Sequence, residues 1–410
     1  MQPVTLKTWI FRLGTGAAVL AALWALQTYA LPHLNPYYQI ILLNAGIAVI
    51  LAVSLNLING ITGQFSLGHA GFMAIGAYVS AYFTKEIGPG TIGAYVSAHF
   101  VKEIGSSGFE VAAPIDNFLT LGFGICVGAL AAGWAGLIVG LPSLRLRGDY
   151  LAIVTLGFNQ IIISIIQNLE IVGGAAGYSG IPRLTTFLWT FALVFLCILT
   201  VRNLAISDLG RSMRAVRDDE IAAEASGINT TRIKVLAFVF SAMWAGVAGA
   251  LQVHLIQLAN PNDFTFLKSV EVVVSVVLGG LGSITGSALA AVGLKVLEEV
   301  LRDVPGVIWT SLGLIALSTY WNYPRHRAAI ARGFSGIVGW LIGPVLALII
   351  VALAYFYAYD FLAQSKGSLR YILYALILIV LMLLRPQGLL GRGEWSLRRR
   401  AKAMKGVSPS

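Results

Sequence analysis

Apolar runs long enough to cross a lipid bilayer recur along the whole chain and leave few other folds open to it. A crossing helix needs about 20 predominantly apolar residues, and such runs follow one another between residues 15 and 384. Hydrophobic residues make up 57% of the sequence and charged residues only 11%, whereas soluble proteins carry about 25% charged residues. The sequence therefore predicts an all-α integral membrane protein, a polytopic helical bundle of about 10–12 apolar segments.

One candidate segment, 269–300, is too long for a single ordinary crossing and contains GGLGS at 279–283. Glycine weakens a helix interior, so we count this segment as two crossings broken at the glycines. This count keeps the C-terminal tail on the same side as the other basic loops, and it implies that some apolar segments are half-spans. The candidate segments are 15–33, 38–58, 61–83, 117–141, 150–168, 184–202, 234–256, 269–300, 306–321, 334–359 and 369–384.

Basic residues give the chain a formal net charge of +10, and their placement identifies the cytoplasmic side. They gather at Arg145 and Arg147, in 202–234, in 325–332 and in the tail 391–410. Short cytoplasmic loops of membrane proteins carry an excess of Lys and Arg. The distribution therefore predicts a basic cytoplasmic tail beside membrane lipid and no nucleic-acid partner. It places the loop 84–116, with four acids and two lysines, on the outside.

The sequence lacks the residue clusters that enzymes use. It contains no G-x-x-x-x-G-K-[ST] phosphate loop and no HExxH pair, and its five histidines are scattered. Cys126 and Cys197 lie inside apolar runs without metal-ligand spacing, as small buried side chains do. We predict no enzyme activity, no metal and no cofactor, and few of the buried charges that a proton-driven carrier needs.

Two apolar segments are interrupted by glycines that stand beside small polar residues: NGITGQFSLGHAGF at 59–72 and LGGLGSITG at 278–286. Paired breaks in two halves of a transporter point to a solute site near the bilayer midplane. Close helix packing, with Gln and His as hydrogen-bonding groups between helices, is the alternative. The candidate path residues are Thr62, Gln64, Ser66, His69, Ser283 and Thr285, and the helix-break glycines are Gly63, Gly68, Gly279, Gly280 and Gly282.

The longest hydrophilic stretch between apolar runs is 204–234. Within it, DDEIAAEASG at 218–227 predicts a short helix with acids at its start, where the helix dipole favours them, and a glycine at its end. Its small residues would let another protein approach closely, whereas an ordinary solvated loop is the alternative. The candidate contact residues are Glu220, Ala223, Glu224 and Gly227.

Five motifs resemble, in the same order, those of permease subunits of bacterial branched-chain amino-acid importers of the ATP-binding-cassette (ABC) class. Together they cover most of residues 40–301 and 369–390. The chain looks like the paired subunit that carries the RLRGDYLAI motif. The motifs are NGITGQFSLGHAGFMAIGAY (59–78), LRLRGDYLAIVTLGF (144–158), EIAAEASGINTTRIKVLAF (220–238), LGGLGSITG (278–286) and LLRPQGL (383–389).

The resemblance implies a multi-pass subunit in a bacterial cell inner membrane. It implies a second homologous permease subunit, two cytoplasmic ATPase subunits and a periplasmic solute-binding protein as partners. It also implies that 204–234 is a coupling loop whose short helix docks on an ATPase. Branched-chain or other neutral amino acids are the implied substrates, with urea or short amides as the alternative. A stand-alone secondary carrier or channel remains the rival class.

Two features depart from the family pattern. IGAYVSAYFTKEIG at 75–88 recurs as IGAYVSAHFVKEIG at 92–105 with two differences in fourteen positions, as expected of a duplication that lengthens an outside loop or a helix end. Extra apolar segments at 303–368 intervene before the final helix. We expect a single transmembrane permease domain over 1–390 that includes them.

Overall fold

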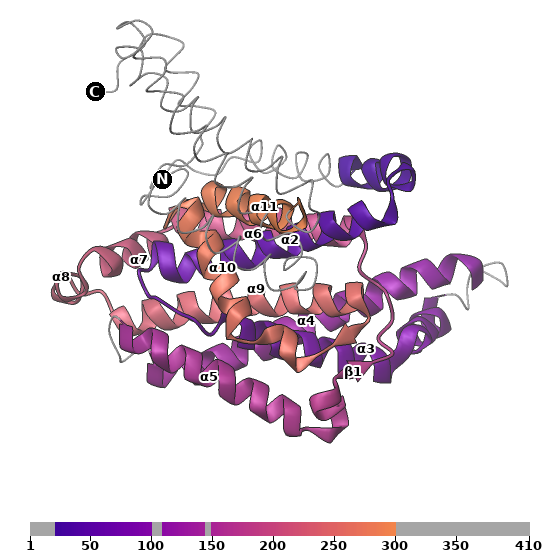
Figure 1. The fold of residues 1–410 in the computed structure, drawn as a ribbon, viewed down its shortest axis with the longest axis horizontal. Helices are drawn as coiled ribbons and strands as arrows, with labels where there is room; N and C mark the ends of the chain where they lie inside the picture. Colours follow the sequence, from indigo (N-terminus) through magenta and orange to yellow (C-terminus); the bar gives the residue numbers. More distant parts are fainter. Residues whose placement is uncertain (1–20, 101–108, 144–148, 301–410) are drawn as a thin grey trace, which may run out of the picture. The chain divides into compact units, whose positions relative to one another are not determined.

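The computed structural model of the protein describes residues 21–100, 109–143 and 149–300 (Figure 1). The chain divides into two compact units, Met1–Val292 with Gln387–Ser410, and Gly293–Pro386. Of the second unit, the described part is the end of one helix, 293–300. The fold described below is therefore that of the first unit.

Helices make up nearly all of the regular structure in the described residues. Short elements join them: η1 (Leu26–Ala30), η2 (Leu31–His33), η3 (Leu57–Ile61), η6 (Glu170–Val172), η7 (Gly174–Ala176), η8 (Pro261–Phe264), β1 (Tyr178–Ser179) and β2 (Leu258–Ala259). The helices are α2 (Pro36–Asn56), α3 (His69–Phe100), α4 (Phe109–Ser143), α5 (Asp149–Asn168), α6 (Phe187–Ile206), α7 (Asp208–Asp218), α8 (Glu220–Ala225), α9 (Thr230–Ile256), α10 (Phe266–Gly279) and α11 (Ile284–Val300).

Five stretches of the described residues are helical, long and apolar enough to cross a membrane. They correspond closely to five of the predicted segments, because an uninterrupted apolar run in a bilayer satisfies its backbone only as a helix. The predicted helical membrane architecture is confirmed, and the protein is a multi-pass membrane protein. These stretches are Pro36–Ile61, Asn117–Ser143, Tyr150–Asn168, Phe187–Ile206 and Thr230–Ile256.

The centre of the first unit is a three-helix contact among α3, α4 and α9, which lie side by side in Figure 1. Glycines let these backbones approach closely, as small residues do between membrane helices. A Cβ atom on Gly76 of α3 would stand 2.2 Å from the Cα of Gly246 in α9. A Cβ on Gly246 would in turn stand 2.9 Å from the carbonyl oxygen of Gly128 in α4. The three helices therefore touch through their backbones at these glycines, where no larger side chain fits.

Of the two predicted segments with glycine breaks, one differs from the helices observed and the other agrees with them. The segment expected at 61–83 begins as a helix only at His69, because residues 63–68 are non-helical and Gly63 has a φ of 76°. The start of that predicted span at 61 was wrong. The segment expected at 269–300 is divided, as predicted, into α10 and α11 by a turn in which Gly280 and Gly282 have φ values of 109° and 89°.

The end of the bundle away from α7 is fastened by a two-stranded antiparallel ribbon of β1 and β2, in which Tyr178 is opposite Ala259. The hydroxyl of Tyr78 in α3 donates a hydrogen bond of 2.8 Å to the carbonyl of Ala259. The ammonium group of Lys85, also in α3, donates to the carbonyl of Ser179 at 3.0 Å. The ribbon thus holds the middle of α3, from Tyr78 to Lys85.

The duplicated sequence extends α3, which continues through residues 92–100 of the second copy. Several other predictions fall outside the described residues. They are the segments 306–321, 334–359 and 369–384, the insertion 303–368, the tail 391–410, Arg145, Arg147 and the last five residues of the repeat.

Replacing Gly246 by Val is expected to destabilise the first unit, because the added atoms would force α9 away from α3 and α4. Overpacking of this kind costs roughly 1–3 kcal/mol. The measurement is the apparent melting temperature of the purified chain in detergent. Gly157→Ala in α5 is the matched control, since a Cβ there has nothing within 4 Å. A melting temperature for Gly246→Val equal to that of the control would contradict the tight helix contact.

Candidate functional site

The first break connects α2 to α3 through η3 and an extended segment, and its polar side chains are buried. Thr62, Gln64, Ser66 and His69 are all less than a tenth exposed. The imidazole Nε2 of His69 shares a hydrogen bond of 2.9 Å with the hydroxyl of Ser54 in α2. His69 therefore joins α3 to α2, and Thr62 returns its hydroxyl to the carbonyl of Leu57 at 2.8 Å.

Gln64 differs from its neighbours in the first break because its side chain has no partner. It is 6% exposed, and neither its Oε1 nor its Nε2 has a hydrogen-bond partner among the described residues. The amide nitrogens of Asn56 and Asn59 are unpaired in the same way. A buried polar group without a partner costs roughly 1–3 kcal/mol. These amides are therefore the groups in the first break with hydrogen-bonding capacity to spare.

The second break is a tight turn between α10 and α11. A Cβ on Gly279 would stand 2.4 Å from the carbonyl carbon of Gly286, so the two helices touch through their backbones. The hydroxyl of Ser283 accepts a hydrogen bond of 3.1 Å from the backbone N–H of Gly286 at the start of α11. Thr285 lies half-buried beside it. Ser283 thus caps the helix that follows the break.

The two breaks meet each other. A Cβ on Gly60 would stand 2.2 Å from the backbone nitrogen of Gly282. The N–H of Gly282 donates a hydrogen bond of 2.9 Å to Oδ1 of Asn56, near the end of α2. The carbonyl oxygen of Gly60 accepts a hydrogen bond of 3.2 Å from Nη1 of Arg217 in α7. We call the group Asn56, Gly60, Arg217 and Gly282 the glycine junction.

Helix α5 closes the extended part of the first break from the other side. The backbone N–H of Leu67 donates to the hydroxyl of Thr155 at 3.0 Å, and a Cβ on Gly68 would stand 2.7 Å from the carbonyl oxygen of Thr155. A Cβ on Gly71 would stand 2.9 Å from Oδ1 of Asn159, an atom without a hydrogen-bond partner among the described residues. The segment 62–68 therefore runs between α5 and the glycine junction.

The loop between α6 and α9 folds into the two helices α7 and α8. Asp219 lies between them and caps α8, since its Oδ1 accepts hydrogen bonds of 2.9 and 3.1 Å from the N–H groups of Ile221 and Ala222. The predicted short helix and its glycine stop are confirmed: α8 ends at Ala225, and Gly227 has a φ of 83°.

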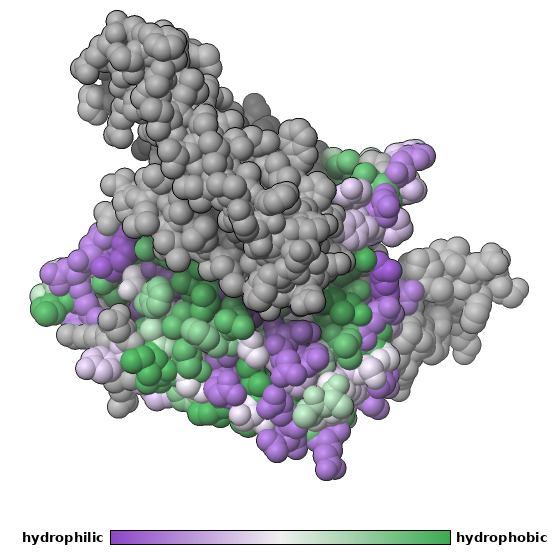
Figure 2. Space-filling view, viewed as in Figure 1, coloured by the Kyte–Doolittle hydropathy of each residue, from purple (hydrophilic) through white to green (hydrophobic). Residues whose placement is uncertain are grey.

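Three of the four predicted contact residues of this loop hold α8 against its own chain. Glu220 pairs with the buried ammonium group of Lys234 in α9 at 2.6 Å. Glu224 accepts a hydrogen bond of 2.6 Å from the hydroxyl of Thr230, and Ala223 is 4% exposed. The large apolar side chain that α8 exposes is Ile221, which is 69% exposed and lies beside exposed alanines. The end of the first unit that carries α7 and α8 is mostly hydrophilic, with a small hydrophobic spot at its tip, as Figure 2 shows.

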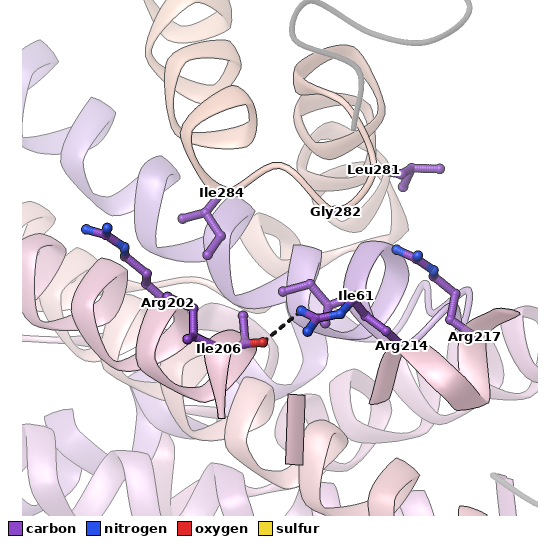
Figure 3. A pocket seen from close by; sticks show the side chains of 9 residues that line it. Ile61, Arg202, Ile206, Arg214, Arg217, Leu281, Gly282 and Ile284 are labelled. Carbon is purple, nitrogen blue, oxygen red and sulfur yellow. Dashed lines mark hydrogen bonds between the residues drawn. The ribbon is translucent and has the colours of Figure 1, made fainter. Parts of the chain in front are cut away.

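A cavity of about 320 Å³ lies beside the glycine junction (Figure 3). In Figure 3, Arg202 stands on α6, and Arg214 and Arg217 extend from α7 beneath the turn that contains Gly282. Arg214 is held by a hydrogen bond of 2.8 Å from its Nη1 to the carbonyl of Ala205. The lining residues are Ile61, Arg202, Ala205, Ile206, Arg214, Arg217, Leu281, Gly282 and Ile284.

Sequence reasoning found both breaks but missed the side chains that join them. Asn56 is a polar residue inside a long apolar run, a signal that could have identified it. Arg217 was counted only as one basic residue of a loop, and nothing in its spacing points to Gly60. Ser269 was also missed; its hydroxyl accepts a hydrogen bond of 3.1 Å from the N–H of Ala70. The described residues hold no cluster of His, Cys, Asp or Glu suited to a metal ion.

Comparison with known proteins identifies the family of the chain. The family model described as "Branched-chain amino acid transport system / permease component" matches residues 37–321. The high-affinity branched-chain amino acid transport system permease protein LivM of Salmonella typhimurium is 35% identical in a 314-residue alignment that covers 67% of this chain and 66% of that protein. The chain thus spans just under two thirds of that relative's length.

More distant relatives include both kinds of permease protein in such systems. The probable branched-chain amino acid transport permease protein LivM of Methanocaldococcus jannaschii is 28% identical, over 65% of this chain and 81% of that protein. The LivH permease protein of Salmonella typhimurium is 27% identical, over 61% of this chain and 80% of that protein. No solved structure matches the chain. On the family match and the LivM likeness, the chain belongs to the family of branched-chain amino acid transport system permease components.

Proposed function

We propose that this chain is one of two membrane subunits of an ATP-driven importer that moves branched-chain or other neutral amino acids into the cytoplasm. The observation that carries the proposal is the family match over 37–321 together with the ordered α7–α8 loop inside it. A lone carrier or channel has no need of a capped helix displayed between two membrane spans. A subunit driven by a separate ATPase does need one.

The proposed partners follow from the same argument. A second, homologous permease subunit completes the membrane part, since proteins named LivM and LivH both resemble this chain. Two cytoplasmic ATPase subunits supply ATP hydrolysis, and a periplasmic solute-binding protein delivers the amino acid. The complex resides in a bacterial inner membrane. Urea or short amides are the alternative substrates, because selectivity in such an importer depends largely on the binding protein.

We propose that α8 is the surface on which the ATPase acts. Its inward side is occupied by the Glu220–Lys234 pair and by Ala223, so its position relative to α9 is fixed. The outward side offers the exposed apolar side chain of Ile221. Ile221 lies beside small exposed alanines of the same helix, so another protein can approach this side of α8 closely. Gly227 then turns the chain from α8 back towards α9.

We further propose that the first break lines the solute path. Gln64, Asn56 and Asn59 keep unpaired amide atoms in a buried place, where such atoms usually bind another protein group, water or a ligand. The amide of Gln64 can both donate to a carboxylate and accept from an ammonium group. His69, Thr62 and Ser283 instead have partners within the chain, so their proposed part in the path is to shape it.

Purification and uptake test the proposed function directly. The tagged chain, expressed with its proposed partners, is expected to co-purify with an ATPase subunit. Proteoliposomes holding the complex and the binding protein are expected to take up leucine only when ATP is supplied. Leucine uptake by vesicles that contain this chain without any ATPase would instead identify a stand-alone carrier.

Gln64→Ala is expected to lower leucine uptake by about 10-fold at equal assembly, the loss of roughly one net hydrogen bond. Ser66→Ala is expected to lower it less, because Ser66 is engaged locally with Gly68. Gln160→Ala in α5 is the matched control, since Gln160 is exposed. If Gln64→Ala lowers only the melting temperature and leaves uptake unchanged, Gln64 serves helix packing and not the path.

Gly227→Val is expected to weaken association with the ATPase and to abolish ATP-driven uptake. A Cβ at Gly227 has nothing within 4 Å, so the cost arises from the left-handed backbone, which disfavours a β-branched residue by roughly 1–2 kcal/mol. Gly227→Asn is the control, because Asn tolerates this conformation. Co-purification of the ATPase with each variant gives the measurement. Equal recovery with Val and Asn would count against the role of this turn.

A further inference from the structure

The side chain of Arg217 connects α7 of the coupling loop to the first break. Its guanidinium group uses three donor nitrogens at once. Nε and Nη2 form a fork on Oδ1 of Asp218 at 3.1 and 3.0 Å, and Nη1 donates to the carbonyl of Gly60 at 3.2 Å. A planar guanidinium can hold such a geometry, whereas the compact ammonium group of a lysine cannot.

Arg217 is the last but one residue of α7, two positions before the residue that caps α8. The N–H of Asp219 still bonds to the carbonyl of Ala215 in α7 at 3.0 Å, while its carboxylate holds the first turn of α8. Helices α7 and α8 are thus joined without a flexible linker. A displacement of α8 therefore reaches the backbone of Arg217 through hydrogen-bonded structure alone.

Beyond Arg217 the contact continues from backbone to backbone. The stem of Arg217 lies across Gly63, where a Cβ would stand 2.5 Å from its Cγ. Gly60, whose carbonyl it binds, touches Gly282, and Asn56 fastens that contact with a hydrogen bond of 2.9 Å. Close-packed backbone transmits displacement because it has no soft side chain to absorb it. The cavity of about 320 Å³ at this place leaves room for the junction to rearrange.

We propose that Arg217 is the positioning residue that transmits movement of α8 to the two helix breaks, so that ATPase motion opens or closes the path at the glycine junction. This proposal rests on the proposed function. It assigns Arg217 no contact with the solute. Its role is to make the two breaks move together with the coupling loop. The two hydrogen bonds to Asp218 orient the guanidinium group so that Nη1 reaches the carbonyl of Gly60.

The test compares leucine transported per ATP hydrolysed in complexes reconstituted with the binding protein. Arg217→Lys and Arg217→Met are expected to lower this ratio by about 10-fold, while basal ATP hydrolysis stays within about two-fold of the original complex. Arg211→Ala is the matched control on the same helix, because Arg211 pairs with Asp208 and is 62% exposed. An unchanged ratio in the Arg217 variants overturns the proposal.

A second pair of variants decides the case if the Arg217 variants fail to assemble. Asp218→Asn weakens the fork at an exposed position, and Asp208→Asn removes the other acidic partner on α7. The ratio is expected to fall in Asp218→Asn and to stay unchanged in Asp208→Asn. Equal ratios overturn the proposal. A complex with all its original residues that fails to couple uptake to ATP instead contradicts the proposed function, so the two failures are distinguishable.

Discussion

Backbone groups released by a broken helix have no water to bind within a bilayer, and each one left unsatisfied costs several kcal/mol. This constraint governs the first break, where α2 ends. When α2 ends, the carbonyl of Gly60 binds Arg217 and the N–H of Ser66 binds Asn59. Further along, the N–H of Leu67 binds Thr155. The break is therefore stable because side chains from several helices converge on it.

The same constraint explains why two breaks occur together. A single interrupted helix needs neighbours that lack side chains at the crossing and that offer donors and acceptors. Gly60 and Gly282 meet these needs for each other, because neither has a side chain where their backbones touch. Asn56 accepts the hydrogen bond of the N–H of Gly282 that the break leaves free. A larger residue at Gly60 would also strike Oδ1 of Asn56, at 2.0 Å from its Cβ. The pair is thus one structural unit, although more than 200 residues separate its halves.

Much of this fold could be predicted from the sequence, because apolar length and glycine position carry the information. The spans 117–141 and 150–168 and the break at 279–283 follow from them directly. The start of α3 did not, since the apolar run continues through residues whose backbone is extended. The partner of Gly60 could not be predicted either. A hydrogen bond between residues 60 and 217 depends on how α7 folds against η3, and no local pattern encodes that packing.

In the loop between α6 and α9, the presence of a short helix was easier to predict than which of its side chains are exposed. Acids near a helix start are favoured by the dipole whichever way they point, so composition could not separate contact residues from supports. In the structure Glu220 pairs with Lys234, which is 5% exposed. An ion pair this buried gains little net stability, but a charge left without its partner there would be costly. The pair therefore fixes one orientation of α8 relative to α9. In this orientation Ile221 is exposed, and the N–H of Asp219 bonds to α7. The charges specify the orientation of α8, and the proposed contact surface includes the apolar side chain of Ile221.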